Sequence, residues 1–396
     1  MKCPLDSMRL AVVTHVVHYR WNGKLYAYAA YAREIEIWAD LFRAVVIAAP
    51  VHEQAPPGDC IPLVHQNIAI QPQLEAGGDS LKGKLGLLLS LPAMLFRIAT
   101  ALRGADAIHV RCPGNLGVLA AALGPFFSRN LVAKYAGQWT DYPGEARTTR
   151  WQKRLLRSRW FSGPVTVYGK WPDMPDHVVP FFTSVLSAEQ IDRARMAARR
   201  PFSDGPLRLL FVGRLTAAKN VGVLLEAIAE VRRLGADIRC DIVGEGPERS
   251  SLENLCGNLN LGAVVEFVGG VDFNQTLGYF ERSDALVLAS ETEGWPKAIT
   301  EAMAFGLVCV GSDRGLVPQI LGEGRGLVVP PGDVTALASA IHGIATARND
   351  YAPMRERAAA WAQQYSLEGL RDALRALLLQ RWRLASQQAA VAMLES

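Results

Sequence analysis

Residues 207–220 read LRLLFVGRLTAAKN, an apolar run that ends in a glycine turn and then becomes polar. The run 207–212 is typical of a buried strand, and residues 221–234 continue with a helical pattern. The same order recurs along the chain. Strands are expected at 10–17, 44–49, 107–110, 131–135, 238–243, 264–268, 285–289, 307–311 and 326–329, and the longer helices at 23–41, 81–102, 115–127, 247–259 and 334–344. Short strands alternating with helices predict a parallel sheet with helices on both faces.

A break in this alternation divides the chain into two α/β halves. We expect a Rossmann-like domain over residues 1–183, a linker over 184–206 and a second Rossmann-like domain over 207–365. Closing helices over 366–396 are expected to cross back to the first domain. Because ligands bind at the carboxyl ends of the strands in such sheets, two facing domains predict a cleft between them.

The composition excludes several classes of protein. Of the 396 residues, 50% are hydrophobic and 20% charged, which is typical of a globular chain and not of a disordered one. The six cysteines lie far apart and form no CxxC, so reduced thiols in a cytoplasmic protein are expected. The longest uncharged apolar runs, 85–96 and 116–127, are shorter than the ~20 residues that span a bilayer. No secretory leader is recognised at the start.

The first candidate site follows the run 207–212. Arg214 and Lys219 lie five positions apart, between a glycine turn at Gly213 and the start of a helix. A helix N-terminus favours anions, arginine binds phosphate in a bidentate manner, and lysine adds a point charge. These residues could form a diphosphate clamp. Ordinary solvated surface charges would give the same pattern.

A second turn, 243–248, reads VGEGPE and again joins a strand to a helix. It lacks the third glycine of GxGxxG, and a proline stands at the helix start. A nicotinamide dehydrogenase is therefore disfavoured. A plain βα turn remains the alternative to a nucleotide contact at Gly244.

The third segment, 290–306, reads SETEGWPKAITEAMAFG. Glu293 and Glu301 are eight positions apart, with a Gly–Pro turn and a helix start between them. Both carboxylates can point into one pocket and accept hydrogen bonds from sugar hydroxyls, and Gly294 lets a ligand approach the backbone closely. The alternative is an ordinary acidic helix start, which the helix dipole favours.

Taken together, these segments resemble the C-terminal half of glycosyltransferase family 4. The resemblance runs from about residue 207 to 344 and includes GRL…K, VGEGPE, EFVGGV, the E-x7-E motif, EAMAFGLVCVGSDRGLVPQIL and GLVVPPGD. The family uses nucleotide sugars, retains anomeric configuration and has the GT-B fold, two facing Rossmann-like domains with a cleft between them. The N-terminal half resembles it only in outline.

The resemblance implies a role for each matching residue. Arg214 and Lys219 would hold the donor diphosphate, Glu301 the ribose, and Glu293 would face the donor sugar. The backbone at the remaining positions would contact the donor: Gly23 and Gly213 near the phosphates, Gly244, Phe267 and Gly269 near the base, and Gly294, Trp295 and Pro296 near the sugar.

The sequence departs from the family at one position. Members commonly carry a sugar-contacting histidine after the strand that corresponds to 131–135, where this chain has Gln138. Either Gln138 takes over that contact, or activity depends less on it. His15 and His18, at the end of the first strand, are candidates for the acceptor side, although loop histidines are more often structural.

The resemblance also implies the reaction: transfer of a hexosyl or N-acetylhexosaminyl group from a UDP- or GDP-sugar to a glycan or lipid-linked acceptor in polysaccharide or glycolipid synthesis. No DxD triplet is present, so we expect no metal and no cofactor besides the nucleotide-sugar co-substrate. Arg214, Lys219 and a helix start would stabilise the leaving diphosphate.

The first half of the chain is basic, and the second is mildly acidic. Residues 147–161 read RTTRWQKRLLRSRWF, with no acidic residue. Basic residues beside aromatic ones suit an anionic membrane surface, which would give peripheral association through Arg147–Phe161. A solvated helix whose Trp and Leu side chains pack on the core is the favoured alternative. Nucleic-acid binding is not expected, because no recognised module accompanies the segment.

Two other functions remain open. A nucleotide-sugar epimerase on the same fold would convert the donor without an acceptor. A non-catalytic subunit would bind the donor and never turn it over, an alternative that the missing histidine suggests.

Overall fold

The computed structural model describes residues 3–75, 81–142, 145–202 and 204–384. By its contacts the chain divides into two units, Met1–Val185 with Leu367–Ser396, and Leu186–Ser366. The predicted closing helices begin near this second boundary, and residues 385–396 lie outside the described residues. Among the described helices, none is long and apolar enough to cross a membrane.

The first unit is built on a parallel sheet with the strand order β11-β10-β9-β8-β1-β4-β7. Its strands are β1 (Arg9–Val13), β4 (Ala44–Ala49), β7 (Ile68–Pro72), β8 (Ala107–Cys112), β9 (Asn130–Tyr135), β10 (Val165–Tyr168) and β11 (Val178–Phe181). Most are short, continuous apolar runs, as expected for strands buried on both faces. The order reverses between β1 and β8.

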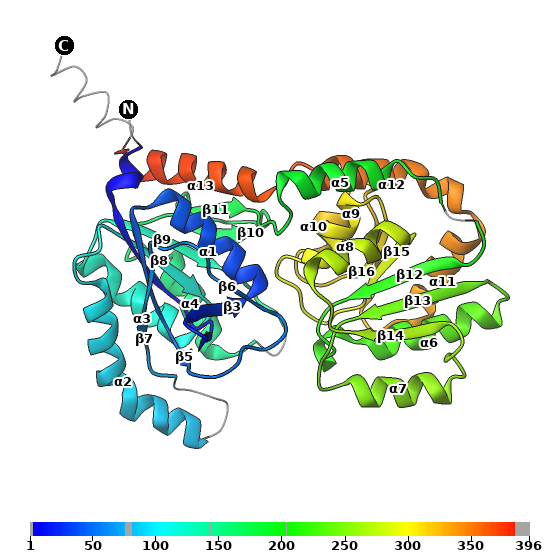
Figure 1. Cartoon of the computed structure of the whole chain (residues 1–396), viewed down its shortest axis with the longest axis horizontal. Helices are drawn as coiled ribbons and strands as arrows, with labels where there is room; N and C mark the ends of the chain where they lie inside the picture. Colours follow the sequence, from blue (N-terminus) through cyan, green and yellow to red (C-terminus); the bar gives the residue numbers. More distant parts are fainter. Residues whose placement is uncertain (1–2, 76–80, 143–144, 203, 385–396) are drawn as a thin grey trace, which may run out of the picture. The chain divides into compact units, whose positions relative to one another are not determined.

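Helices cover both faces of this sheet (Figure 1). They are α1 (Ala29–Leu41), α2 (Leu81–Leu102), α3 (Asn115–Leu123), α4 (Arg147–Arg157) and α13 (Leu367–Arg381), with short 3-10 turns at Pro4–Ser7 and Gly124–Phe126. Leu10 and Val12 of β1 pack under α1 and α13, whereas Ala11 and Val13 pack under α2 and α3. This alternation follows from the two-residue period of a strand.

The first unit contains a small second sheet, with two strands from between β1 and α1 and two from between β4 and β7. Its order is β5-β2-β3-β6, with β2 (His18–Trp21), β3 (Lys24–Tyr28), β5 (Val51–His52) and β6 (Cys60–Pro62). The strands β2 and β3 form a hairpin joined by Asn22 and Gly23. The predicted helix over 23–41 is therefore wrong at its start, because residues 24–28 pair as a strand and the helix begins at Ala29.

The second unit has a parallel sheet with the order β14-β13-β12-β15-β16-β17. Its strands are β12 (Leu207–Val212), β13 (Ile238–Val243), β14 (Val265–Gly269), β15 (Ala285–Leu288), β16 (Val308–Ser312) and β17 (Leu327–Val329). Numbered along the unit, this is the order 3-2-1-4-5-6 of a Rossmann domain, which reverses between β12 and β15.

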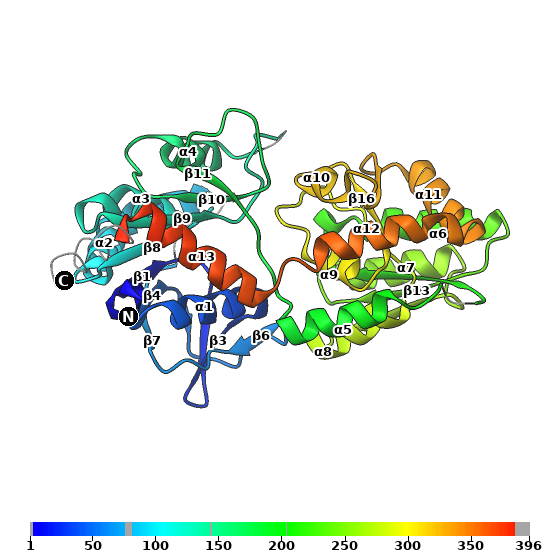
Figure 2. The same cartoon turned by 90° about the horizontal axis from the view of Figure 1, so that it is seen from above.

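Eight helices of the described chain belong to the second unit (Figure 2). They are α5 (Ala188–Ala198), α6 (Val221–Arg233), α7 (Arg249–Asn258), α8 (Phe273–Arg282), α9 (Lys297–Ala304), α10 (Val317–Leu321), α11 (Val334–Thr346) and α12 (Ala352–Ala362), with 3-10 turns at Ala217–Lys219 and Arg348–Tyr351. The helices α6 and α11 pack together, and α5, α9 and α12 form another group.

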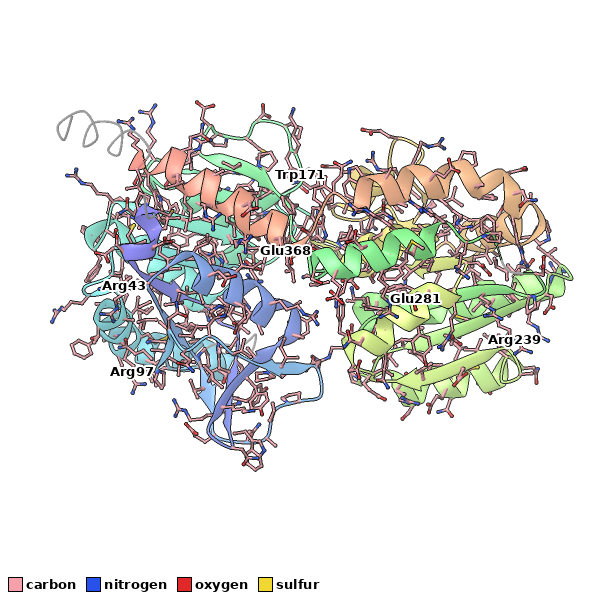
Figure 3. The ribbon with its side chains drawn as sticks, turned by 45° about the horizontal axis from the view of Figure 1, so that its top comes forward. Arg43, Arg97, Trp171, Arg239, Glu281 and Glu368 are labelled. Carbon is pink, nitrogen blue, oxygen red and sulfur yellow. The ribbon has the colours of Figure 1, made fainter. Side chains whose placement is uncertain are left out.

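The segment 184–206, predicted as a linker, instead contains α5. This helix starts with a capping box in which the Ser187 hydroxyl accepts from the Gln190 amide at 3.2 Å and the Gln190 side chain accepts from the Ser187 amide at 3.0 Å. Arg193 of α5 binds Glu281 of α8 through two contacts of 2.5 and 2.7 Å. Glu281 is labelled in Figure 3. The segment is thus packed into the second unit.

Candidate functional site

The candidate site of the second unit lies at the carboxyl ends of neighbouring strands. Gly213 follows β12, Gly244 follows β13, Gly269 ends β14 and Glu293 follows β15. The carboxyl ends of parallel strands lie at one edge of the sheet, so the sequence order alone brings these segments together. The reversal of strand order between β12 and β15 is where such sheets bind ligands.

Lys219 and Glu293 meet across this reversal point. Lys219 Nζ lies 2.5 Å from Glu293 Oε1, and the two side chains are 27% and 8% exposed. Lys219 ends the 3-10 turn after β12, and Glu293 comes from the loop between β15 and α9. A carboxylate this poorly solvated requires a charged partner. The ammonium group of Lys219 supplies it and remains partly open to solvent.

Arg214 is exposed, and its side chain forms no ion pair or hydrogen bond with the residues that the structure describes. Its guanidinium is therefore available to an anion. Its backbone is held firmly, because the flanking Gly213 and Leu215 amides donate to Val243 O at 3.0 Å and Glu245 O at 2.9 Å. The two turns that follow β12 and β13 are thus bound to each other along their backbones.

A close backbone contact explains why position 244 is a glycine. A Cβ atom at this position would lie 1.9 Å from Gly213 O, and Gly244 has a φ of 144°. Its amide donates to Gly269 O at 2.9 Å. The three predicted base-side and phosphate-side positions Gly213, Gly244 and Gly269 are therefore joined in one backbone network.

The structure adds a residue that the sequence did not single out at this edge. Arg249 donates to Phe267 O at 3.1 Å and pairs with Glu245 at 2.5 Å and Glu253 at 2.8 Å. The Phe267 carbonyl, predicted to face the base, is thus bound to a side chain. An arginine one helical turn from two glutamates was the signal available in the sequence.

The loop that carries Glu293 is packed against the loop after β16. A Cβ atom on Gly315 would lie 1.7 Å from Glu293 O, and Gly315 has a φ of 54°. On the other side, Trp295 Nε1 donates to Thr300 Oγ1 at 3.2 Å. The loop is therefore fixed at both ends, with Gly294 between them and the buried Pro296 as the cap of α9.

Glu301 lies in α9, is 8% exposed and belongs to the same loop–helix unit as Glu293. Trp295 also packs on aromatic residues near the end of this unit: its ring centroid lies 6.3 Å from Trp361 and 5.9 Å from Tyr365. In the described chain no three His, Cys, Asp or Glu side chains are grouped so that they could hold a metal ion.

The acceptor-side candidates lie in the first unit, and they differ in their exposure to solvent. His15 is exposed at the carboxyl end of β1, with a pKa lowered by desolvation and by Arg111. Gln138, after β9, donates to Thr140 Oγ1 at 3.1 Å. Gly23, predicted instead to lie near the donor phosphates, is at the tip of the β2–β3 hairpin. The roles of these residues stay predictions.

The structure contradicts the predicted acceptor-side role of His18. It is fully buried, Nδ1 lies 2.9 Å from Val16 O, and its ring meets Tyr31 edge-on at 5.4 Å. Burial lowers its pKa to about 4. A neutral ring held in the core cannot reach an acceptor, so His18 is a packing residue.

The basic segment forms α4 and the turn after it. Lys153 is buried and pairs with Glu145 at 2.8 Å and Asp141 at 2.6 Å. The exposed surface is formed instead by five arginines and three aromatic side chains. We call it the basic aromatic patch: Arg147, Arg150, Arg154, Arg157, Arg159, Phe126, Trp151 and Trp160.

Known proteins are similar to part of this chain. Residues 192–361 match the model of the family glycosyl transferases group 1. The chain is 31% identical over 156 residues to the amylovoran biosynthesis glycosyltransferase AmsK of Erwinia amylovora, covering 38% of each chain. It is 34% identical over 177 residues to glycogen synthase of Mycobacterium tuberculosis, covering 44% of this chain and 42% of that protein. The matched part spans less than half of either relative.

A solved structure extends the likeness to the whole fold. The structure of Anabaena Alr3699/HepE in complex with UDP and glucose covers 94% of this chain and 99% of its own, with a TM-score of 0.66 and 17% identity. The predicted α/β architecture of two Rossmann-like domains, the GT-B fold, is confirmed.

Proposed function

We propose that this chain is a retaining glycosyltransferase of family 4 that transfers a sugar from a nucleotide sugar to a glycan or lipid-linked acceptor. The observation that carries the proposal is the Lys219–Glu293 pair at the strand reversal point, with the unpaired guanidinium of Arg214 after the same strand. Arg214 and Lys219 provide two cationic side chains, and the buried carboxylate of Glu293 holds the second. This arrangement suits a diphosphate that is attached to a sugar.

The chemistry follows from the charges. In the reaction the bond between the anomeric carbon and the diphosphate oxygen breaks, and negative charge develops on the diphosphate. Arg214 and Lys219 would stabilise that charge without a metal. The acceptor oxygen forms the new bond to the anomeric carbon on the same face, and its proton passes to the departing phosphate oxygen.

The comparisons support the donor and acceptor classes. The fold neighbour from Anabaena was solved with UDP and glucose, which favours UDP over GDP as the first donor base to test. The relative from Erwinia is named for amylovoran biosynthesis, which favours a growing polysaccharide or its lipid-linked precursor as acceptor.

We also propose that the enzyme works on the cytoplasmic face of a membrane, bound through the basic aromatic patch. Trp151 is 55%, Trp160 47% and Phe126 72% exposed, and the rings of Phe126 and Trp160 meet at 5.4 Å. Large exposed rings among arginines suit the interface of an anionic bilayer. A lipid-linked acceptor would then be presented at that surface.

A thermal-shift series with UDP, GDP, ADP and dTDP sugars, with and without EDTA, tests the donor site. Binding to the folded state raises the melting temperature by mass action. A shift with one nucleotide that persists in EDTA supports the metal-free site. No shift with any nucleotide would contradict the proposal. Product analysis then separates transfer from epimerisation, and a protein that binds without any turnover would be a non-catalytic subunit.

A further inference from the structure

The small sheet of the first unit has one face rich in aromatic side chains. The register pairs His18 with Ala27, and these two buried residues point to the core. Because side chains alternate along a strand, the neighbouring positions lie on the opposite face. We call this the aromatic face; its aromatic members are Tyr19, Trp21, Tyr26, Tyr28 and His52, and Lys24 lies on the same face opposite Trp21.

Much of the aromatic face is open to solvent. Trp21 is 44% and Tyr28 49% exposed, and the hairpin of β2 and β3 projects from the body of its unit (Figure 2). Cross-strand pairing explains Tyr19 opposite Tyr26, since such aromatic pairs stabilise a hairpin. Cross-strand pairing does not explain why the rings of Trp21 and Tyr28, near the ends of the strands, remain about half exposed.

Polar groups lie beside Tyr19 and His52 on the same face. Tyr19 and His52 meet edge-on at 5.6 Å, and His52 Nε2 lies 2.9 Å from Glu75 Oε2. Desolvation, then the negative charges of Cys60, Asp59 and Glu75, raise the pKa of Tyr19. On the opposite side of β2, Arg20 pairs with Glu53 at 2.5 Å.

This combination selects one kind of ligand. A pyranose has an apolar C–H face that packs on an aromatic ring and a rim of hydroxyls that bind carboxylates, tyrosine and histidine. The face carries charges of both signs, because Glu75 is bound to His52 and Lys24 lies opposite Trp21. It therefore lacks the uniform positive charge that suits an anionic membrane, in contrast to the basic aromatic patch, whose exposed charges are arginines.

The position of the sheet gives the ligand a role. The strand β1 ends at Val13, and β2 begins at His18, so the small sheet extends from the carboxyl end of the central strand, where His15 also lies. We infer that the aromatic face binds the glycan part of the acceptor, at sugar units away from the reacting one. This inference rests on the proposed glycosyltransferase function.

The test uses the full chain on an array of hexose and N-acetylhexosamine oligosaccharides. We expect the native protein to bind a subset, and Trp21→Ala with Tyr28→Ala to lower that signal at least tenfold. Trp151→Ala is the matched control, since it removes a similarly exposed tryptophan from the basic aromatic patch of the same unit. Circular dichroism shows whether each variant is folded.

Three outcomes would overturn the inference: no binding to any oligosaccharide, equal binding by the native and double-variant proteins, or a variant that loses binding to phosphatidylglycerol vesicles instead. The donor site has a separate readout, because the thermal shift with UDP-sugar does not involve the aromatic face. Loss of array binding with an intact nucleotide shift supports the inference. An absent nucleotide shift in the native protein contradicts the proposed function instead.

Discussion

Lys219 Nζ lies 2.5 Å from Glu293 Oε1, and the two residues come from opposite sides of the point where the strand order of the second sheet reverses. The pair therefore links the loop after β12 to the loop after β15. An incoming diphosphate would meet an ammonium group that is already oriented, and the donor sugar would meet a carboxylate whose charge is already balanced.

Replacing Glu293 by Gln tests this arrangement. The amide keeps the shape but cannot hold the ammonium by charge, so we expect transfer to fall on the order of a hundredfold. Lys219 is partly exposed and can be solvated instead, so the fold should survive. The control is Glu230→Gln, which breaks the surface pair with Arg233 and should change neither activity nor stability. Unchanged transfer by Glu293→Gln would remove this residue from the site.

Replacing Arg214 by Gln should weaken nucleotide binding. The guanidinium has no partner to lose among the described residues, so the melting temperature without ligand should stay constant. A charge-assisted hydrogen bond contributes about 1.5–3 kcal/mol. Its loss should weaken the binding of UDP by roughly tenfold or more, as measured by calorimetry. An unchanged affinity would show that the diphosphate lies elsewhere. Arg239→Gln, on an exposed part of β13, is the matched control.

Replacing Gly315 by Ala should move the Glu293 loop. The added Cβ would lie 1.7 Å from Glu293 O, in a backbone conformation that itself costs about 1–3 kcal/mol for a residue other than glycine. We expect a lower melting temperature and a loss of turnover. Gly235→Ala, with a φ of 85° and no atom within 4 Å of the new Cβ, isolates the backbone cost. Equal turnover in the two variants would contradict the close packing of the loops.

Acid should destabilise the first unit through His18. Its pKa is lowered to about 4 in the fold, so the folded state binds fewer protons than the unfolded state below pH 6.5. The contribution of neutral His18 to the free energy of unfolding is therefore complete above pH 6.5. It is lost as the pH falls towards 4, by about 2 kcal/mol at pH 5. His18→Phe should flatten this dependence in denaturant titrations at pH 7 and pH 5, whereas His52→Asn should not. An unchanged slope in His18→Phe would refute the assignment.

Charge reversal of Arg154 and Arg157 to Glu should weaken binding to phosphatidylglycerol vesicles in a sedimentation assay. Each exposed arginine near an anionic surface contributes about 1 kcal/mol, so the double variant should lose at least tenfold in affinity. Trp151→Ala should weaken binding further, and raised salt should reduce native binding. Trp21→Ala, outside the basic aromatic patch, serves as control. Salt-independent binding or equal binding by the charge-reversed protein would exclude the patch as a membrane site.

Most of the parallel strands could be predicted from the sequence because they are short, largely apolar runs, whereas β7, β10 and β11 were not predicted. The β2–β3 hairpin was missed because Tyr, Trp and Ala at 19–28 are compatible with either period, and the strand character comes from pairing with β5 and β6. The helix α5 was missed although Ser187 and Gln190 form a capping box, because its Ala- and Arg-rich composition also suits a linker.

The candidate site was predictable to the level of segments. Motif spacing placed Arg214, Lys219 and Glu293 after neighbouring strands, but not which carboxylate would hold Lys219, since Glu291 and Glu301 lie close in sequence. The burial of His18 depends on Tyr31 of α1, a tertiary contact with no signal in the local sequence. The role of Arg249 at the end of β14 depends likewise on a contact between elements.

Because α13 is made last and packs in the first unit, the core of that unit is completed only after the second unit has been synthesised. Leu370, Leu374 and Leu378 are buried in the same core as Leu10 of β1, and Trp382 Nε1 donates to Leu131 O at 3.0 Å. At typical elongation rates of about 5–20 residues per second, this helix leaves the ribosome roughly ten seconds or more after residue 185. The part of that apolar face that α1 does not cover stays exposed during this interval, while the whole second unit is being made. Chaperone demand during translation should therefore concentrate on the sheet face that α13 later covers.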